Sequence, residues 1–171
     1  MGIEGSWSGM RKYLEENMLA ESLRGRVRYN CTQYAGMEDW HIFEIYIDNR
    51  LEKRFSLTEV NSYFISNGYK KDEKPFGELE YWSDFNSILD SVPIQERTEY
   101  TDSEFCDALE KYRNQSIDAS LDSDNPIEIM FAVLDRRTGK RTLDKYKDSF
   151  MNQPQWLQKI FSIRADAKKI N

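Results

Sequence analysis

A short basic cluster is the strongest candidate for chemistry in this sequence. Its members, Arg136, Arg137, Lys140 and Arg141, surround Gly139. A glycine-containing turn flanked by guanidinium groups can bind a phosphate or a carboxylate, because guanidinium groups donate paired hydrogen bonds to such anions. The cluster lacks the GxxxxGK[ST] pattern of a P-loop. It therefore predicts a general anion-binding or partner-binding site.

The same residues also have an architectural interpretation. We expect Arg136 and Arg137 in the last turn of a helix, where positive charge offsets the negative end of the helix dipole. Gly139 would then adopt the left-handed conformation that commonly ends a helix. Asp135 could hold the arginines through paired hydrogen bonds. The sequence leaves both interpretations open.

The remaining polar motifs favour structural roles. Three aspartates form a short run, Asp118, Asp122 and Asp124. They lack the glycine and glutamate of an EF-hand loop, so we expect them in turns and helix caps. His41 begins an expected strand and has no serine or cysteine elbow near it in sequence. The sequence therefore predicts no catalytic residue, no metal site and no cofactor.

Composition indicates a globular protein. The chain has 171 residues, of which 39% are hydrophobic, 32% charged and 13% aromatic. We expect a single compact domain over residues 1–171, with sub-lobes 1–68 and 76–171 as a finer division. No apolar run approaches the roughly 18–20 residues of a membrane helix, so no membrane association is expected. Two widely spaced cysteines are typical of a reducing compartment, and we expect a cytoplasmic location.

Charge is unevenly distributed along the chain. Basic and acidic residues number eight and ten in 1–68, six and fifteen in 69–125, and ten and five in 126–171. The middle is therefore strongly acidic, whereas the C-terminal quarter is basic. The two regions could neutralise each other inside the fold or present opposite charges to partners.

Periodicity predicts an α+β fold that starts with a helix, a three-stranded antiparallel meander and a second helix. Ser6 is a good N-cap for an amphipathic helix that extends to about Leu23. Alternating residues then indicate strands at 26–31, 41–48 and 51–55, with a turn at Asp48-Asn49. Ser56 to Glu59 match a capping box, which predicts a helix over 57–67 ended by Gly68.

The C-terminal half is expected to be mainly helical. Helical spacing connects Leu79, Trp82, Phe85 and Leu89, and a further helix begins at Thr101. Asn125-Pro126 combines an N-cap with proline at the first helical position, so residues 127–134 are predicted to form a central buried helix. A buried strand remains the alternative, because periodicity cannot assign a short apolar run. Two more helices follow, one on each side of Pro154.

Nucleic-acid binding is not expected. The α-β-β-β-α order of residues 1–68 matches that of the double-stranded-RNA-binding domain, and Arg24, Arg26 and Arg28 could contact phosphates. That domain, however, uses a lysine-rich start of its second helix, where this chain has the sequence SLTE. The overall pI of about 5.0 also argues against a nucleic-acid ligand.

Four segments together resemble a family of uncharacterised bacterial proteins. They are WSGMRKYLEENM, LRGRVRYNCTQY, NPIEIMFAVLDRRTGKRTL and QPQWLQKIFSIRADA. Residues 69–100 contribute little to the resemblance. It implies a bacterial, cytoplasmic protein, and it transfers no catalytic or binding residue.

The sequence favours a non-enzymatic binding or interaction protein with an unidentified protein partner. In one version the protein resembles an immunity protein, and the acidic segment 72–110 masks a basic toxin. The alternative is an enzyme or small-anion binder that uses a basic pocket around residues 136–141. This alternative requires the four basic side chains to converge on one concave site.

Overall fold

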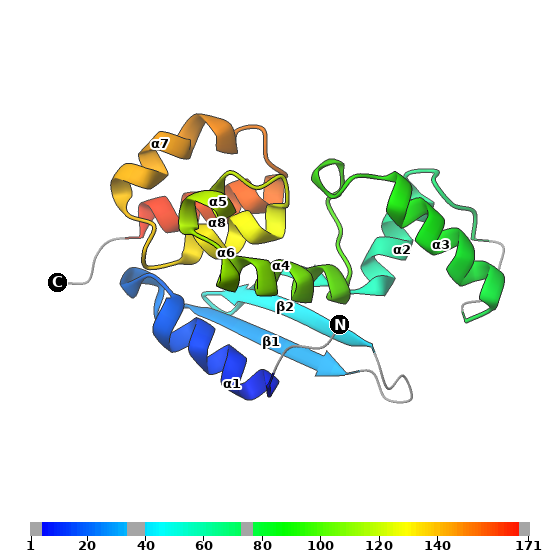
Figure 1. The fold of residues 1–171 in the computed structure, drawn as a ribbon, viewed down its shortest axis with the longest axis horizontal. Helices are drawn as coiled ribbons and strands as arrows, with labels where there is room; N and C mark the ends of the chain where they lie inside the picture. The colour runs from blue at the N-terminus through cyan, green and yellow to red at the C-terminus, as the bar shows by residue number, and fades with distance from the viewer. Residues whose placement is uncertain (1–4, 34–39, 73–76, 168–171) are drawn as a thin grey trace.

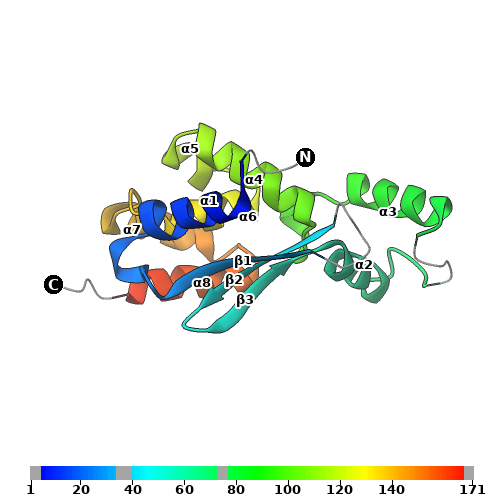
Figure 2. The same cartoon turned by 90° about the horizontal axis from the view of Figure 1, so that it is seen from below.

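A computed structural model describes residues 5–33, 40–72 and 77–167. It confirms the α+β class, with α-helices and a three-stranded antiparallel sheet of order β1-β2-β3. The sheet lies at one side of the molecule, and α4 (Asp102–Asn114), α6 (Pro126–Leu134) and α8 (Gln155–Asp166) pack against it (Figures 1 and 2). None of the helices in these ranges is long and apolar enough to cross a membrane.

The described N-terminal half contains three short helical elements, the sheet and one longer helix. The elements are α1 (Trp7–Lys12), a π-helix η1 (Tyr13–Met18), a 3-10 helix η2 (Glu21–Leu23), β1 (Val27–Gln33), β2 (His41–Ile47), β3 (Arg50–Phe55) and α2 (Leu57–Ser66). The predicted turn joins β2 to β3, and Asp48 and Asn49 both have positive φ angles, 51° and 64°. Such a two-residue turn matches the twist of the strands that it connects.

The C-terminal half is helical, as predicted. Its elements are α3 (Leu79–Ser91), a 3-10 helix η3 (Ile94–Glu96), α4 (Asp102–Asn114), α5 (Ile117–Leu121), α6 (Pro126–Leu134), α7 (Lys140–Phe150) and α8 (Gln155–Asp166). Thr101 and Glu104 form a reciprocal capping box at the start of α4. At α2 the Ser56 hydroxyl accepts a hydrogen bond from the Glu59 N–H at 3.3 Å, while the Glu59 carboxylate pairs with Arg54.

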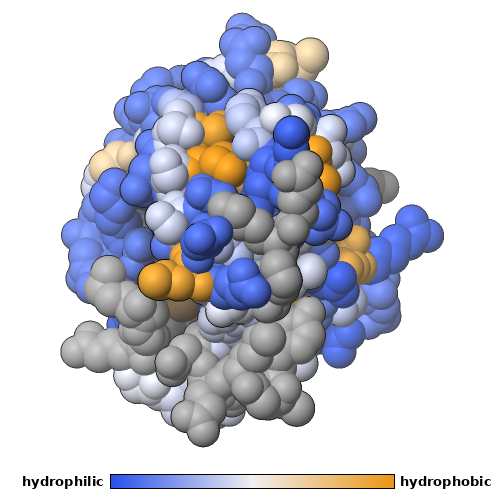
Figure 3. Space-filling view, turned by 90° about the vertical axis from the view of Figure 1, so that its right-hand side faces the viewer, coloured by the Kyte–Doolittle hydropathy of each residue, from blue (hydrophilic) through white to orange (hydrophobic). Residues whose placement is uncertain are grey.

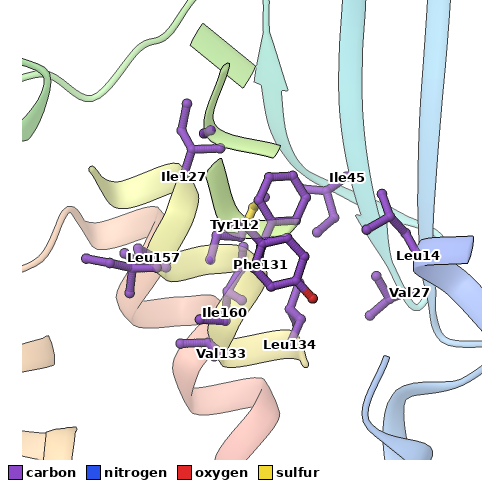
Figure 4. Close-up of a cluster of buried hydrophobic side chains, with 14 of the residues drawn as sticks. Leu14, Val27, Ile45, Tyr112, Ile127, Phe131, Val133, Leu134, Leu157 and Ile160 are labelled. Atoms are coloured by element: carbon purple, nitrogen blue, oxygen red, sulfur yellow. The ribbon is translucent and has the colours of Figure 1, made fainter. Parts of the chain in front are cut away.

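Helix α6 is the centre of the main core. The structure confirms residues 127–134 as a helix, and all nine residues of α6 are buried. It packs on α4, α5 and α8. Phe131 projects from α6 toward the sheet, where its ring lies 6.0 Å from Tyr29, 5.2 Å from Tyr112 and 5.4 Å from Phe105 (Figure 4). Residues from both halves of the chain therefore share one hydrophobic cluster.

A second, smaller hydrophobic cluster joins α2 to α3. Its buried members are Val60, Phe64, Tyr81 and Phe85. The predicted helix α3 is present, but Leu79, which was expected on its inner face, is 85% exposed. Tyr81 is buried instead, and its ring stacks on that of Phe85 at 6.4 Å. Seen from the α3 side, the surface is mostly hydrophilic with separate apolar patches (Figure 3).

The N-terminal helix is shorter than predicted. It changes to π-helical hydrogen bonding at Tyr13 and stops before Leu19, which is extended. The reason is a tertiary contact: Leu19 forms an antiparallel bridge with Asp135, and the Ala20 N–H donates to the Leu134 carbonyl at 2.8 Å. This pairing requires an extended backbone where the sequence pattern indicates a helix.

We expect Phe131→Ala to lower the free energy of unfolding by about 3–5 kcal/mol, because it leaves a cavity among three aromatic rings that cannot fully collapse. Met151→Ala, at a position that is 71% exposed, should change it by less than about 0.5 kcal/mol. Urea unfolding followed by circular dichroism measures both. A small effect of Phe131→Ala would show that α6 is not the centre of the core.

Candidate functional site

The predicted basic cluster lies at the junction of α6 and α7. Helix α6 ends at Leu134, so Arg136 and Arg137 follow the helix instead of forming its last turn. Lys140 and Arg141 begin α7. All four basic side chains are exposed. The expected dipole-capping role of the two arginines is therefore wrong, because the chain is already extended at Asp135.

Gly139 does not have the predicted left-handed conformation. Its φ is −81° and its ψ is 172°, and it serves as the N-cap of α7. The end of α6 is instead stabilised by contacts with other segments. The Thr138 hydroxyl donates to the Ala132 carbonyl at 2.5 Å, and the Arg136 N–H donates to the Met18 carbonyl at 2.8 Å. A left-handed glycine is therefore unnecessary.

Asp135 is a buried carboxylate that binds one member of the basic cluster. It is 1% exposed. Arg137 donates to it from the backbone N–H at 2.7 Å, from Nε at 3.1 Å and from Nη2 at 2.7 Å. The Tyr112 hydroxyl donates to the same carboxylate. Arg137 is therefore committed to an internal ion pair, and its pKa is raised chiefly by these hydrogen bonds.

The other three basic residues do not converge with Arg137 on a common acid. In the described part of the chain, the side chains of Arg136, Lys140 and Arg141 form no ion pair. They lie near helix α7, at one end of the long axis of the molecule (Figure 1). Their use by an anion or a partner stays a prediction.

Part of the acidic middle segment is used inside the fold. Glu99 pairs with the buried Lys53 at 2.6 Å. Glu104 pairs with Arg97, which is only 2% exposed, and the Arg97 Nε donates to the Val92 carbonyl at 3.2 Å. These contacts bind the loop between α3 and α4 to the sheet. The C-terminal basic residues take no part in them.

Asp102 at the start of α4 is also buried, and it accepts a hydrogen bond from the His41 N–H at 3.1 Å. The other seven acidic residues on or beside α3, η3 and α4 are exposed. We call them the acidic face, which comprises Glu78, Glu80, Asp84, Asp90, Glu96, Asp107 and Glu110. The exposed cations on these elements are Lys111 and Arg113, both near the end of α4. Helices α4 and α3 follow each other along one side of the molecule (Figure 2), and α3 is at the opposite end from α7 (Figure 1). The acidic middle and the basic C-terminal part of the sequence therefore also lie at different places on the surface of the fold.

The two cysteine thiols are not activated as nucleophiles. Burial raises the pKa of the Cys31 thiol to about 11 and that of Cys106 to about 12. Both thiols therefore stay protonated near neutral pH, whereas the thiolate is the nucleophilic form. His41 begins β2, as expected, and its ring stacks on Phe43 at 6.0 Å. In the described ranges, no three His, Cys, Asp or Glu residues are placed to hold a metal ion.

The three aspartates of the expected turn segment lie around α5. Asp118 is in its first turn, and Asp122 is its C-cap. The Tyr146 hydroxyl of α7 donates to Asp122 at 2.7 Å. Asp124 directly precedes Asn125, the N-cap of α6, whose side chain accepts from the Ile127 N–H at 3.0 Å. Turn and cap positions therefore account for this run.

A polar network occupies the sheet face that is turned away from the core. Glu44 is at its centre, and it accepts hydrogen bonds from Asn30 at 3.1 Å, Tyr46 at 3.0 Å and Arg54 at 2.9 Å. Burial by itself raises the pKa of Glu44, but these hydrogen bonds outweigh it, so the pKa lies below its usual value. Three donors therefore favour the ionised form of Glu44.

The fold and these contacts define an α+β protein whose acidic and basic surface residues are separated, and no metal-ligand cluster is present among the described residues. A family model matches residues 6–165, and the chain belongs to the SF0329 protein family, which has no assigned function. No curated protein and no solved structure matches the chain. The sequence prediction of an uncharacterised family is confirmed.

Replacement of Asp135 should weaken the junction between α4 and α6. We expect Asp135→Asn to lower the free energy of unfolding by about 1.5–3 kcal/mol, because hydrogen bonds to a charged acceptor are lost in a buried place. Thermal unfolding of this variant and of Asp144→Asn, an exposed control, measures the effect. Equal stability of the two variants would contradict the structural role of Asp135.

The Glu44 network predicts a specific pH dependence of stability. Because the folded-state pKa lies below the usual value of 4.5, ionised Glu44 stabilises the fold above about pH 4.5. This contribution is lost as the pH falls through the folded-state pKa. The stability difference between the wild type and Glu44→Gln should therefore shrink between about pH 7 and about pH 3.5. Urea unfolding measures it, and Glu16→Gln, at an exposed position, should show no such trend.

Proposed function

We propose that this protein is a non-enzymatic binding protein whose acidic face binds a basic protein partner. The observation that carries the proposal is the exposure of seven carboxylates on α3, η3 and α4. The acidic residues that the fold itself requires, such as Glu99 and Glu104, are already paired inside. In the described ranges, the side chains of Asp90, Glu96 and Asp107 are exposed and form no ion pair, and the mutual repulsion of such carboxylates has a cost in stability.

An exposed apolar residue accompanies these charges. Leu79 at the start of α3 is 85% exposed, between Glu78 and Glu80. A large apolar side chain within a charged surface is typical of a contact position, because interfaces combine an apolar anchor with a charged rim. Helix α3 thus offers a partner both charge and an apolar contact.

The separation of charge favours one orientation of the partner. The acidic face includes one end of the molecule, while Arg136, Lys140 and Arg141 lie near α7 at the other end. A basic partner is attracted to the first end and repelled by the second. Such complementarity raises the association rate and suppresses wrong orientations.

An immunity-like role is the specific version of this proposal. Toxins that cleave nucleic acids need a basic surface to bind phosphates. An inhibitor with an acidic face can cover that surface and exclude the substrate. Segment 72–110, which was expected to mask a basic toxin, contains all seven residues of the acidic face.

Charge reversal tests the proposal. We expect the triple variant Asp90→Lys, Glu96→Lys and Asp107→Lys to lose at least about tenfold in recovery of a stoichiometric basic partner from the native cell. The control variant Asp144→Lys, Asp148→Lys and Asp166→Lys has the same change in net charge on exposed positions of α7 and α8. Affinity purification with quantitative mass spectrometry compares them with the wild type.

Two results would contradict the proposal. One is the absence of any stoichiometric partner of the wild-type protein. The other is an equal loss of the partner in both triple variants, which would indicate an effect of net charge alone. Co-expression with toxins encoded next to the gene tests the immunity-like version, which requires that the wild type protects the cell and the first triple variant does not.

A further inference from the structure

A polar groove lies along the edge strand β1, and none of the acidic-face residues lines it. Its volume is about 500 Å³. The residues that line it come from α1, η1, β1 and β2, namely Arg11, Glu15, Arg28, Tyr29, Asn30 and Tyr46. A volume in this range is typical of sites for small molecules or for single groups of larger ligands.

One wall of the groove is the turn of π-helix at residues 13–18. Glu15 of this helix accepts a hydrogen bond from the Tyr29 N–H at 2.7 Å. Because β1 is an edge strand, this N–H has no partner within the sheet, and the carboxylate satisfies it. Leu14 beside it is buried in the core. The wall is therefore anchored both by packing and by a charged hydrogen bond. Short π-helical turns also occur frequently at functional sites.

The other wall is the outer face of the sheet. Arg28 is paired with Tyr46 in the register of β1 and β2, and Asn30 is paired with Glu44. The Arg28 guanidinium lies 5.9 Å from the centre of the Tyr46 ring, and the Tyr46 hydroxyl is held by Glu44. The side chains of this wall are therefore oriented before any ligand arrives.

The charges of the groove leave two guanidinium groups available. Arg11 and Arg28 are exposed, and neither forms an ion pair with another residue of the described ranges. The nearby carboxylates are engaged: Glu44 is paired with Arg54, and one oxygen of Glu15 is bound to Tyr29. The available hydrogen-bond donors are thus two guanidinium groups, Arg11 on the helical side of the groove and Arg28 on the sheet side.

We propose that this groove binds an oxyanion, the phosphate or carboxylate group of a small ligand, between Arg11 and Arg28. Guanidinium groups bind such groups through two parallel hydrogen bonds, and donors on opposite walls can contact different oxygens of one anion. This site is distinct from the acidic face and from residues 136–141, so it stands independently of the proposed function.

Anion titrations of the full-length protein test the site. Inorganic phosphate and acetate are the two probes, added at constant ionic strength and followed by nuclear magnetic resonance of the backbone amides. We expect saturable binding with a Kd of about 1 mM, with shifts of the Tyr29, Asn30 and Tyr46 amides. Saturation by phosphate alone assigns a phosphate ligand, and saturation by acetate alone assigns a carboxylate ligand.

Variants connect the binding to the two arginines. Arg11→Ala and Arg28→Ala should each weaken the binding at least about tenfold. Arg50→Ala, at an exposed arginine of β3 outside the groove, should leave it unchanged. Arg28→Lys retains the charge but not the paired donors, so its loss of affinity should lie between that of the wild type and that of Arg28→Ala. If Arg28→Ala does not fold, Arg28→Lys replaces it as the test of Arg28.

The proposal is overturned if neither anion saturates the shifts by about 10 mM, tenfold above the expected Kd. It is also overturned if binding persists in both Arg11→Ala and Arg28→Ala, or if Arg50→Ala reduces it equally. None of these outcomes depends on a protein partner, so a failure here is distinguishable from a failure of the acidic face.

Discussion

The burial of Asp135 at the end of α6 is the interaction on which much of the structure depends. Its carboxylate receives hydrogen bonds from Tyr112 of α4 and from Arg137, while its backbone forms the bridge with Leu19. A buried carboxylate is costly unless its oxygens are satisfied, so these contacts must form together. One residue thereby sets the end of α6, the path into α7 and the position of the N-terminal segment.

The acidic middle of the chain serves two separate purposes. Glu99 and Glu104 neutralise Lys53 and Arg97, two basic residues that the fold buries. The carboxylates of the acidic face are exposed, and none of them pairs with a C-terminal basic residue in the described part of the chain. The buried basic residues are therefore neutralised by nearby carboxylates, whereas the exposed acidic residues and the exposed C-terminal basic residues lie apart on the surface. The proposed partner surface consists of the acidic residues that remain exposed.

Local signals in the sequence predicted much of the fold. Caps such as Ser56 and Thr101, the Asp48-Asn49 turn and the Asn125-Pro126 start of α6 all act within a few residues, so the sequence shows them directly. The predictions that were wrong involve long-range contacts. Residues after Met18 and after Leu134 become extended because they pair with each other, and neither segment shows that partner in its own pattern.

The candidate sites, too, combine features that the local sequence shows with features that depend on long-range contacts. The alternation of β1 already placed Arg28 and Asn30 on one face, and the basic cluster at 136–141 was visible as a run of charges. No sequence pattern indicated Arg11 as a site residue, because Arg11 and Arg28 line one groove only when α1 and η1 pack beside β1. The sequence by itself determined the α+β class, most helix starts and the excess of acid in the middle of the chain. Only the tertiary structure decided which charges are paired and which are exposed, because ion pairing depends on distances between segments far apart in the chain.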